Sequence, residues 1–228
     1  MNMPVLEEKK TYFDNYWREQ STEIADPRGR QRAMAVLSLL DKKSGRLLDV
    51  GCGRGIALDF FAYRGFDVTG VDISPEAVNM VKKKGHQAYI IDLERDEIPG
   101  KYDFVLCLEV LQQLYDPSKL LNKLKSSLAP NGEMLVSLPN EFHIVSRLRI
   151  LFGLSHLGDF RHSHIRMFTP SRDRTLFKSA DLNIVREICI PIIPPKWKIL
   201  STIFKPLTQI FPSLLAISSI YRLKKKLL

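Results

Sequence analysis

The feature that most restricts the fold is a short apolar run that leads into three alternating glycines. The run LLDVGCGRG spans residues 47–55, with Gly51, Gly53 and Gly55 at alternate positions, and the helical pattern IALDFFAYRG follows it. Glycine lets the backbone turn tightly and approach a ligand where a Cβ would collide. The pattern therefore predicts a buried strand, a ligand-binding turn and a helix in succession.

The rest of the chain continues this alternation of strand and helix. Helices are predicted after Ser74-Pro75, over 118–127 and after Thr169-Pro170, and further strands over 67–72, 87–92, 102–109, 133–139 and 182–193. Each crossover helix returns the chain to the same end of the sheet, so the first five strands, up to 133–139, pair in parallel. The prediction is an α/β doubly wound domain over roughly residues 30–193.

The glycine loop does not match a nicotinamide-binding fingerprint. The pattern G-x-G-x-x-G needs its third glycine at position 56, which is Ile56 here. Asp49 stands two residues before the first glycine. A carboxylate at that place suits a ligand with cationic groups better than a pyrophosphate.

Two further acids each end one of the next two predicted strands. Asp72 lies about 20 residues after the loop, where a carboxylate can accept both ribose hydroxyls. Asp92 ends the following strand, where its side chain can reach an adenine edge. Together with the loop, these acids predict a site for a nucleoside joined to an amino acid.

The segments LLDVGCGRG, GVDIS, IIDLE, DFVLCLEVLQQLYDP and LKSSLAPNGEMLVSLPN, over about residues 47–140, resemble class I S-adenosylmethionine (SAM)-dependent methyltransferases of the small-molecule type 11/12. The resemblance implies SAM as cofactor. It also implies a Rossmann-like seven-stranded sheet, parallel with an antiparallel C-terminal hairpin, flanked by helices and carrying a helical cap insertion. The cofactor-binding residues that it implies are Asp49, Gly51, Cys52, Gly53, Gly55, Asp72, Ile73, Asp92, Leu93 and Leu108.

The candidate catalytic residues are His164, His143 and Glu109. The resemblance places Glu109 facing the sulfonium, and HIRMFT at 164–169 resembles a recurring H-x-R-x-F-T segment of related enzymes. Histidine is the usual proton acceptor near neutral pH. We therefore expect His164, with His143 opposite, to shape the acceptor pocket; the alternative is that these histidines, with His156 and His162, bond backbone carbonyls in a loop.

The segment after the fourth predicted strand argues against a metal. In many relatives it reads E-V-L-E-H, whereas here Gln112 and Gln113 replace the second acid and the histidine. Two metal ligands or bases are thereby lost. We predict no metal, which departs from the metal-assisted O-methylation of ubiquinone-type relatives.

Three regions are expected along the chain. Residues 1–45 form an N-terminal helical lid, 46–193 the SAM-binding core with the cap insertion 140–168, and 194–228 a basic apolar segment with the last strand. Tyr12, Tyr16 and Trp17 either stack over the cofactor or pack on the sheet edge.

The excess positive charge belongs to the C-terminal segment. Of the net charge of +9, the stretch 188–228 contributes seven basic residues and no acid. A nucleic-acid enzyme more often spreads basic residues over a groove, so no nucleic acid is expected as partner. The segment either completes the fold or also contacts an anionic membrane surface, with Trp197 at the headgroups.

The N-terminus has no apolar run of a signal peptide, and the three cysteines form no C-x-x-C pair. A cytoplasmic protein, in one view peripheral to the inner face of a membrane, is expected. The leading hypothesis is methyl transfer to an oxygen of a small molecule, glycan or lipid-linked intermediate. The alternatives are an accessory subunit of an acyltransferase, since SLPNEFHIVSRLRILFG with HIRMFT is similar to the protein MetW, and an RNA methyltransferase.

Overall fold

The computed structural model describes residues 3–19, 27–154, 164–193 and 197–226. Its seven-stranded sheet has the strand order β3-β2-β1-β4-β5-β7-β6. This order, with the last two strands antiparallel, confirms the predicted class I methyltransferase fold. The chain divides into two compact units, residues 1–108 with 123–134 and residues 109–122 with 135–228.

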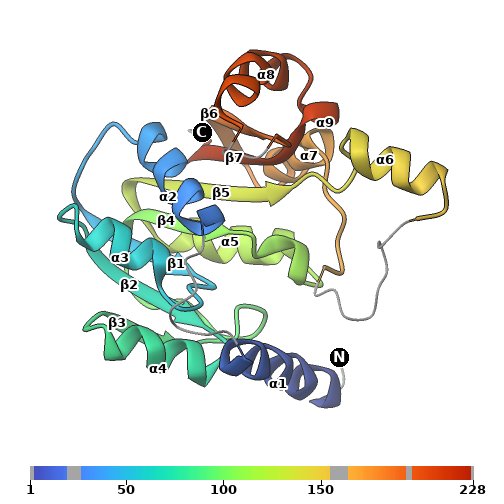
Figure 1. Ribbon diagram of the computed structural model, residues 1–228. Helices are drawn as coiled ribbons and strands as arrows, with labels where there is room; N and C mark the ends of the chain where they lie inside the picture. The colour runs from blue at the N-terminus through green and yellow to red at the C-terminus, as the bar shows by residue number, and fades with distance from the viewer. Residues whose placement is uncertain (1–2, 20–26, 155–163, 194–196, 227–228) are drawn as a thin grey trace. The chain divides into compact units, whose positions relative to one another are not determined.

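The first unit holds the glycine loop and the parallel strands on both sides of it (Figure 1). Its elements are α1 (Met3–Glu19), α2 (Pro27–Leu39), β1 (Arg46–Val50), α3 (Ile56–Ala62), β2 (Asp67–Asp72), α4 (Pro75–Lys83), β3 (Gln87–Ile90) and β4 (Tyr102–Leu108). Two elements continue from one unit into the other, α5 (Pro117–Ser127) and β5 (Leu128–Pro139).

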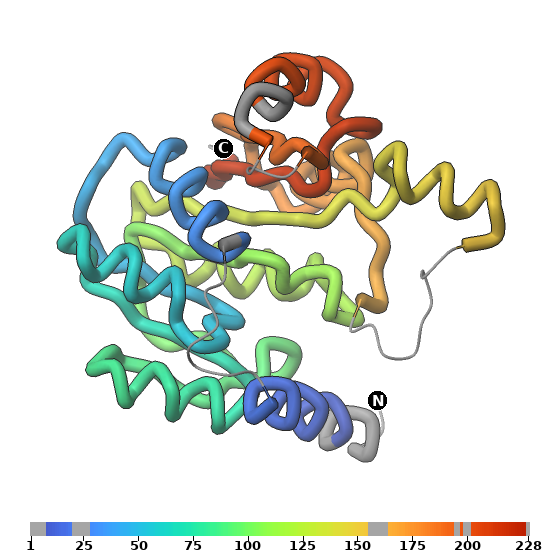
Figure 2. The backbone as a smooth tube through the Cα atoms, viewed as in Figure 1, coloured from blue at the N-terminus to red at the C-terminus, as the bar shows by residue number. Residues whose placement is uncertain are grey.

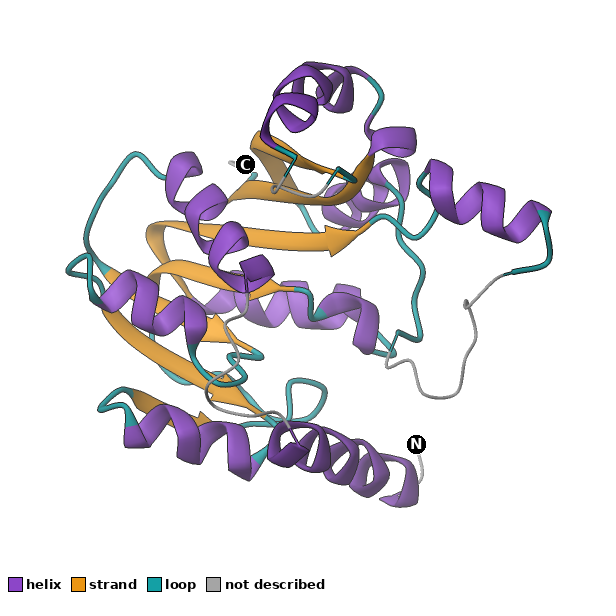
Figure 3. Ribbon diagram, in the orientation of Figure 1, coloured by secondary structure: helices purple, strands orange, loops and turns teal. Residues whose placement is uncertain are grey.

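Strand β1 lies at the centre of the parallel strands of this unit, and its sequence reflects that burial. Leu47, Leu48 and Val50 are buried, and β1 pairs in parallel with β2 on one side and β4 on the other. Such a strand has no solvent-facing side, which accounts for its continuous apolar sequence. Figure 3 shows α3 and α4 beside β1, β2 and β3.

The predicted start of α4 is confirmed. Ser74 is its N-cap, with the side-chain oxygen accepting a hydrogen bond from Ala77 N at 3.2 Å, and Pro75 occupies the first turn. Because α4 begins directly after β2, this cap also fixes the direction in which the chain leaves Asp72.

The second unit contains the antiparallel hairpin and the helices around it. Its elements are the 3-10 helix η1 (Leu111–Gln113), α6 (Ile144–Leu151), α7 (Pro170–Ser179), β6 (Leu182–Pro191), α8 (Lys198–Ile210), α9 (Pro212–Leu215) and β7 (Ala216–Lys225). β6 and β7 run side by side, in orange and red, in Figure 2. This pairing confirms the predicted antiparallel C-terminal hairpin, with β7 as its last strand.

One strand begins earlier than predicted. The sequence predicts a helix over 118–127 and a strand over 133–139, but β5 starts at Leu128. The chain nevertheless turns sharply here, since a Cβ on Gly132 would lie 3.0 Å from Ala129 N and 3.1 Å from Ala129 O. The residues on both sides of this turn are extended. The proline and glycine of APNG are typical of a turn, so the sequence pattern did not indicate a strand there.

Part of the cap insertion, residues 155–163 with His156 and His162, lies outside the described residues. The described helices include none that is both long and apolar enough to cross a bilayer. The division into lid, core and C-terminal segment stays a prediction.

Candidate active site

The glycine loop between β1 and α3 needs glycine at all three alternating positions. Gly51, Gly53 and Gly55 have φ values of 67°, 50° and 79°, in the left-handed region that strains other residues. Gly51 N and Cys52 N both donate to Val71 O, at 2.8 and 3.1 Å. The turn is thus pinned to β2 by its own backbone, so its shape exists before any ligand binds.

Asp72 ties the same loop to the start of α4. Its Oδ2 accepts from Gly53 N at 2.9 Å, and its Oδ1 accepts from Ser74 N at 3.0 Å. The carboxylate is 6% exposed. Burial raises the pKa of Asp72, although these backbone hydrogen bonds oppose the shift.

Asp49, near the end of β1, is a second buried carboxylate, 4% exposed. Burial, reinforced by the charge of Asp72 and opposed by Arg32, raises the pKa of Asp49 to about 8. Burial and the neighbouring carboxyl disfavour the charged form of each acid, so a ligand with positive charge is favoured beside them. The ammonium and sulfonium groups of SAM supply that charge, so these residues fit the cofactor implied by the sequence.

The other predicted cofactor-binding residues lie in this loop or at the carboxyl ends of the neighbouring strands. Cys52 points into the fold, because its Sγ would lie 2.8 Å from a Cβ on Gly70. Asp92 Oδ1 accepts from Glu94 N at 2.9 Å, which shapes the turn after β3. Leu93 is buried, whereas Ile73 and Leu108 are half-buried.

In the second unit, Glu109 adopts a conformation that is unusual for a residue with a side chain. Its φ is 60°, and such strain persists mostly at functional sites. Ser137 Oγ donates to Glu109 Oε1 at 2.8 Å, and Gln112 Nε2 lies 3.4 Å from Oε2. Glu109 is therefore a carboxylate held in one orientation by neighbours from β5 and η1.

His164 forms a histidine–carboxylate pair in the same unit. Its Nδ1 lies 2.7 Å from Glu141 Oε1. The peptide groups that follow His164 are attached to η1, since Ile165 N and Arg166 N both donate to Gln112 O, at 2.9 and 3.0 Å. A carboxylate at Nδ1 fixes the ring and favours the tautomer with its lone pair on Nε2, as in many general bases.

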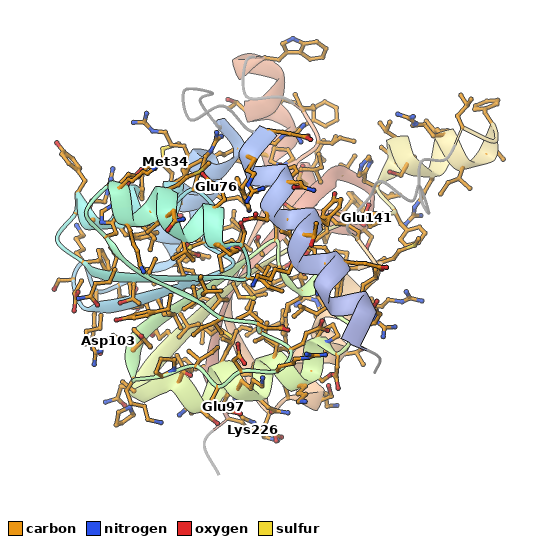
Figure 4. All side chains as sticks on the ribbon, turned by 90° about the horizontal axis from the view of Figure 1, so that it is seen from below. Met34, Glu76, Glu97, Asp103, Glu141 and Lys226 are labelled. Atoms are coloured by element: carbon orange, nitrogen blue, oxygen red, sulfur yellow. The ribbon has the colours of Figure 1, made fainter. Side chains whose placement is uncertain are left out.

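Sequence reasoning missed Glu141, which is labelled in Figure 4. The available signal was its place two residues after β5, at the end of a strand where ligands bind in such folds. His143, predicted to lie opposite His164, is the N-cap of α6: its Nδ1 accepts from Ser146 N at 3.3 Å. Its part in an acceptor pocket stays a prediction.

Within the described ranges, no three His, Cys, Asp or Glu side chains gather so as to hold a metal ion. The absence of a metal from the reaction stays a prediction.

The family model for the methyltransferase domain matches residues 16–187, which is most of the chain. The chain belongs to the methyltransferase-domain family. It is a SAM-dependent methyltransferase, with the glycine loop, Asp49 and Asp72 in the positions described above.

Two curated relatives are both ubiquinone biosynthesis O-methyltransferases. The one from Aeromonas salmonicida is 28% identical over 66% of this chain and 69% of its own length. The one from Marinobacter nauticus is 39% identical over 42% of this chain and 44% of its own length. Among solved structures, magnesium protoporphyrin IX methyltransferase from Synechocystis with bound SAH has a TM-score of 0.68 and 19% identity. It covers 96% of this chain and 99% of its own, and shows a shared fold.

Proposed function

We propose that this methyltransferase methylates a hydroxyl group of a small, lipid-linked acceptor, with His164 as the general base and Glu141 as its positioning residue. The observation that carries the proposal is the 2.7 Å contact between His164 Nδ1 and Glu141 Oε1. Two relatives named as O-methyltransferases support an oxygen as the attacking atom.

The transfer needs an electrophilic methyl group and a reactive acceptor oxygen. SAM supplies an electrophilic methyl group on a sulfonium. The first unit would hold it through Asp49, Asp72 and the glycine loop. A neutral hydroxyl is a weak nucleophile, so its oxygen gains reactivity when a base takes its proton. His164 Nε2 would accept that proton, and the Glu141 carboxylate would stabilise the resulting imidazolium.

Glu109 supports this assignment as a second acidic group of the second unit. Its carboxylate already accepts from Ser137 Oγ at 2.8 Å and lies 3.4 Å from Gln112 Nε2. It would orient the acceptor by a hydrogen bond from a second hydroxyl.

An apolar acceptor is favoured by the exposed side of α8. Ile203, Leu207 and Ile210 recur at helical spacing and are 57%, 39% and 65% exposed, while Thr208 is buried on another side. Lys205 is exposed, and the stretch 188–228 has no acid. Such a helix is suited to lie on an anionic bilayer, where a lipid-linked acceptor is found.

The transfer is tested with methyl-labelled SAM and a panel of polyprenylated phenols, lipid-linked glycans and water-soluble phenols. We expect label in a lipid-soluble hydroxyl compound, and H164A to lose most of the rate. The control is H86A, whose histidine pairs with Asp59 at 2.8 Å on the first unit. Unchanged turnover in H164A would show that His164 is not the general base. Label on a nitrogen atom would show that the attacking atom is not oxygen.

Membrane contact is tested separately by flotation with vesicles containing anionic lipid. Wild type should float at low salt and less at moderate salt, because salt screens the lysines over about 10 Å at 0.1 M. The double variant I203E/I210E should stay unbound, whereas the control Y63E, on an 89% exposed residue of the first unit, should float. If wild type, I203E/I210E and Y63E all stay in the unbound fraction, α8 does not bind the membrane and serves only the fold.

A further inference from the structure

Helix α1 contacts the loops that follow three neighbouring parallel strands of the first unit. Lys9 Nζ lies 3.0 Å from Glu94 Oε2 after β3, and Asp14 contacts the segment after β2. Trp17 covers the glycine loop after β1. The three contacts follow in chain order across the edge where the predicted cofactor residues lie, and Figure 1 shows α1 beside the ends of β2 and β3.

Asp14 makes the central contact. Its Oδ1 accepts from both Ser74 Oγ and Glu76 N at 3.0 Å, and Arg18 lies 2.7 Å from its Oδ2. Glu76 stands on the first turn of α4, at the end of that helix nearest α1 (Figure 4). Ser74 N also donates to Asp72 Oδ1, so Asp14 holds the same segment that positions the Asp72 carboxylate.

Trp17 makes the closest approach to the loop. A Cβ on Gly53 would lie 2.4 Å from Trp17 Cζ2 and 2.6 Å from Cη2, so the indole lies directly on the glycine. Gly53 N is the group that donates to Asp72 Oδ2. The indole thus covers the residue that joins the loop to the ribose-binding acid.

Over residues 8–19, where the side chains are described, α1 makes polar contacts and one aromatic contact with the rest of the first unit. Among residues 8–19 none is fully buried, and Tyr12 and Tyr16 are 40% and 43% exposed. Segments with little buried apolar surface open at lower free energy than the core. A helix that closes the cofactor edge yet is weakly attached has the properties of a gate.

We propose that α1 gates the cofactor site: Trp17 forms a wall of the bound cofactor's site, and the cofactor enters and leaves when Asp14 and Lys9 release their partners. The proposal rests on the assignment of the loop, Asp49 and Asp72 to the cofactor. It deepens that assignment by naming the residues that control exchange.

The test measures dissociation of S-adenosylhomocysteine (SAH) from the full chain by stopped-flow fluorescence. The chain has two tryptophans, so W197F leaves Trp17 as the single reporter. We expect a saturable change in Trp17 emission on SAH binding. D14A and K9E should raise the dissociation rate by about tenfold or more, and K9E/E94K should restore it, because the charge pair is re-formed.

Matched controls separate gating from loss of folding. E8A alters an exposed residue of the same helix and should leave the rate unchanged. Melting temperatures of all variants should stay close to that of wild type, since none of residues 8–19 is fully buried. Higher salt should also raise the wild-type dissociation rate.

The two ways of failing are distinguishable. If wild type binds no SAH, the cofactor assignment itself is wrong. If wild type binds SAH but D14A and K9E keep the wild-type dissociation rate, and W17A keeps the wild-type SAH affinity in calorimetric titration, α1 is a packing helix and the gate is wrong.

Discussion

His164 and Glu141 are 23 residues apart in sequence, and the histidine Nδ1 lies 2.7 Å from a carboxylate oxygen of the glutamate. One residue follows β5 and the other precedes α7, so the cap insertion joins them. Because Ile165 and Arg166 are hydrogen-bonded to Gln112, the histidine is fixed by backbone as well as by its partner. The pair is therefore positioned before any acceptor arrives.

Replacing Glu141 should reduce turnover without reducing cofactor binding. In E141Q the amide no longer stabilises an imidazolium, and we expect kcat to fall by up to about 10²–10⁴-fold, the contribution of general acid–base catalysis. H164A should lose about 10²–10⁴-fold. If E141Q shifts the pH profile of kcat while SAH affinity is unchanged, the positioning role is supported; identical profiles for E141Q and wild type would refute it.

Gly53→Ala should damage both the loop and the lid contact. The new Cβ would meet Trp17 at 2.4 Å, in addition to the strain of a positive φ, which costs about 1–3 kcal/mol. Gly85→Ala is the matched control, since Gly85 also has a positive φ, 86°, with no atom within 4 Å of its Cβ position. Calorimetric titration should show SAH binding lost in G53A and kept in G85A. Equal affinity in the two variants would contradict the loop assignment.

Cofactor binding should release a proton near neutral pH. Without ligand the pKa of Asp49 is raised to about 8 by burial and by Asp72, so the group is largely protonated at pH 6.5. A ligand ammonium lowers that pKa, so SAH affinity should rise from pH 6 towards pH 8. Titration in two buffers of different ionisation enthalpy measures the released proton. D49N should bind more weakly with no such release, and the same proton release from D49N would assign it to another group.

Stability should also depend on pH through a buried acid outside the site. Burial raises the pKa of Asp173 to about 7, although Tyr221 OH donates to its Oδ2 at 2.7 Å. Its Oδ1 has no hydrogen-bond partner among the described residues. The folded state therefore holds this proton more tightly than the unfolded state, whose pKa is near 3.8. The stability that this proton contributes therefore falls as the pH rises from about 4 to 7.

D173N removes that titration and keeps an acceptor for Tyr221. The difference in unfolding free energy between wild type and D173N should change with pH by at most about 1.4 kcal/mol per pH unit. Denaturant unfolding at several pH values measures it. D67N is the control, since Asp67 is an exposed residue whose side chain is 72% accessible. A pH dependence of D173N parallel to that of wild type would show that Asp173 does not titrate in this range.

The sequence predicted the backbone geometry of the candidate site where a local pattern determines it. The strand and glycine spacing of residues 47–55 requires one backbone geometry, and Asp72 follows because it ends the next parallel strand. Glu141 could not be paired with His164, because a contact across 23 residues has no periodic signal. The same holds for Lys9 and Glu94, which are 85 residues apart. Long-range polar contacts depend on how elements pack, which periodicity alone does not specify.

The most direct test of the central claim is calorimetric titration of SAH into wild type, D72N and the surface control D67N. The account predicts binding of one SAH per chain in wild type and D67N. D72N should bind at least tenfold more weakly, because its amide replaces the carboxylate that holds Gly53 N and Ser74 N. Folded wild-type protein that binds no SAH, or D72N with wild-type affinity, would contradict the assignment of this loop to the cofactor.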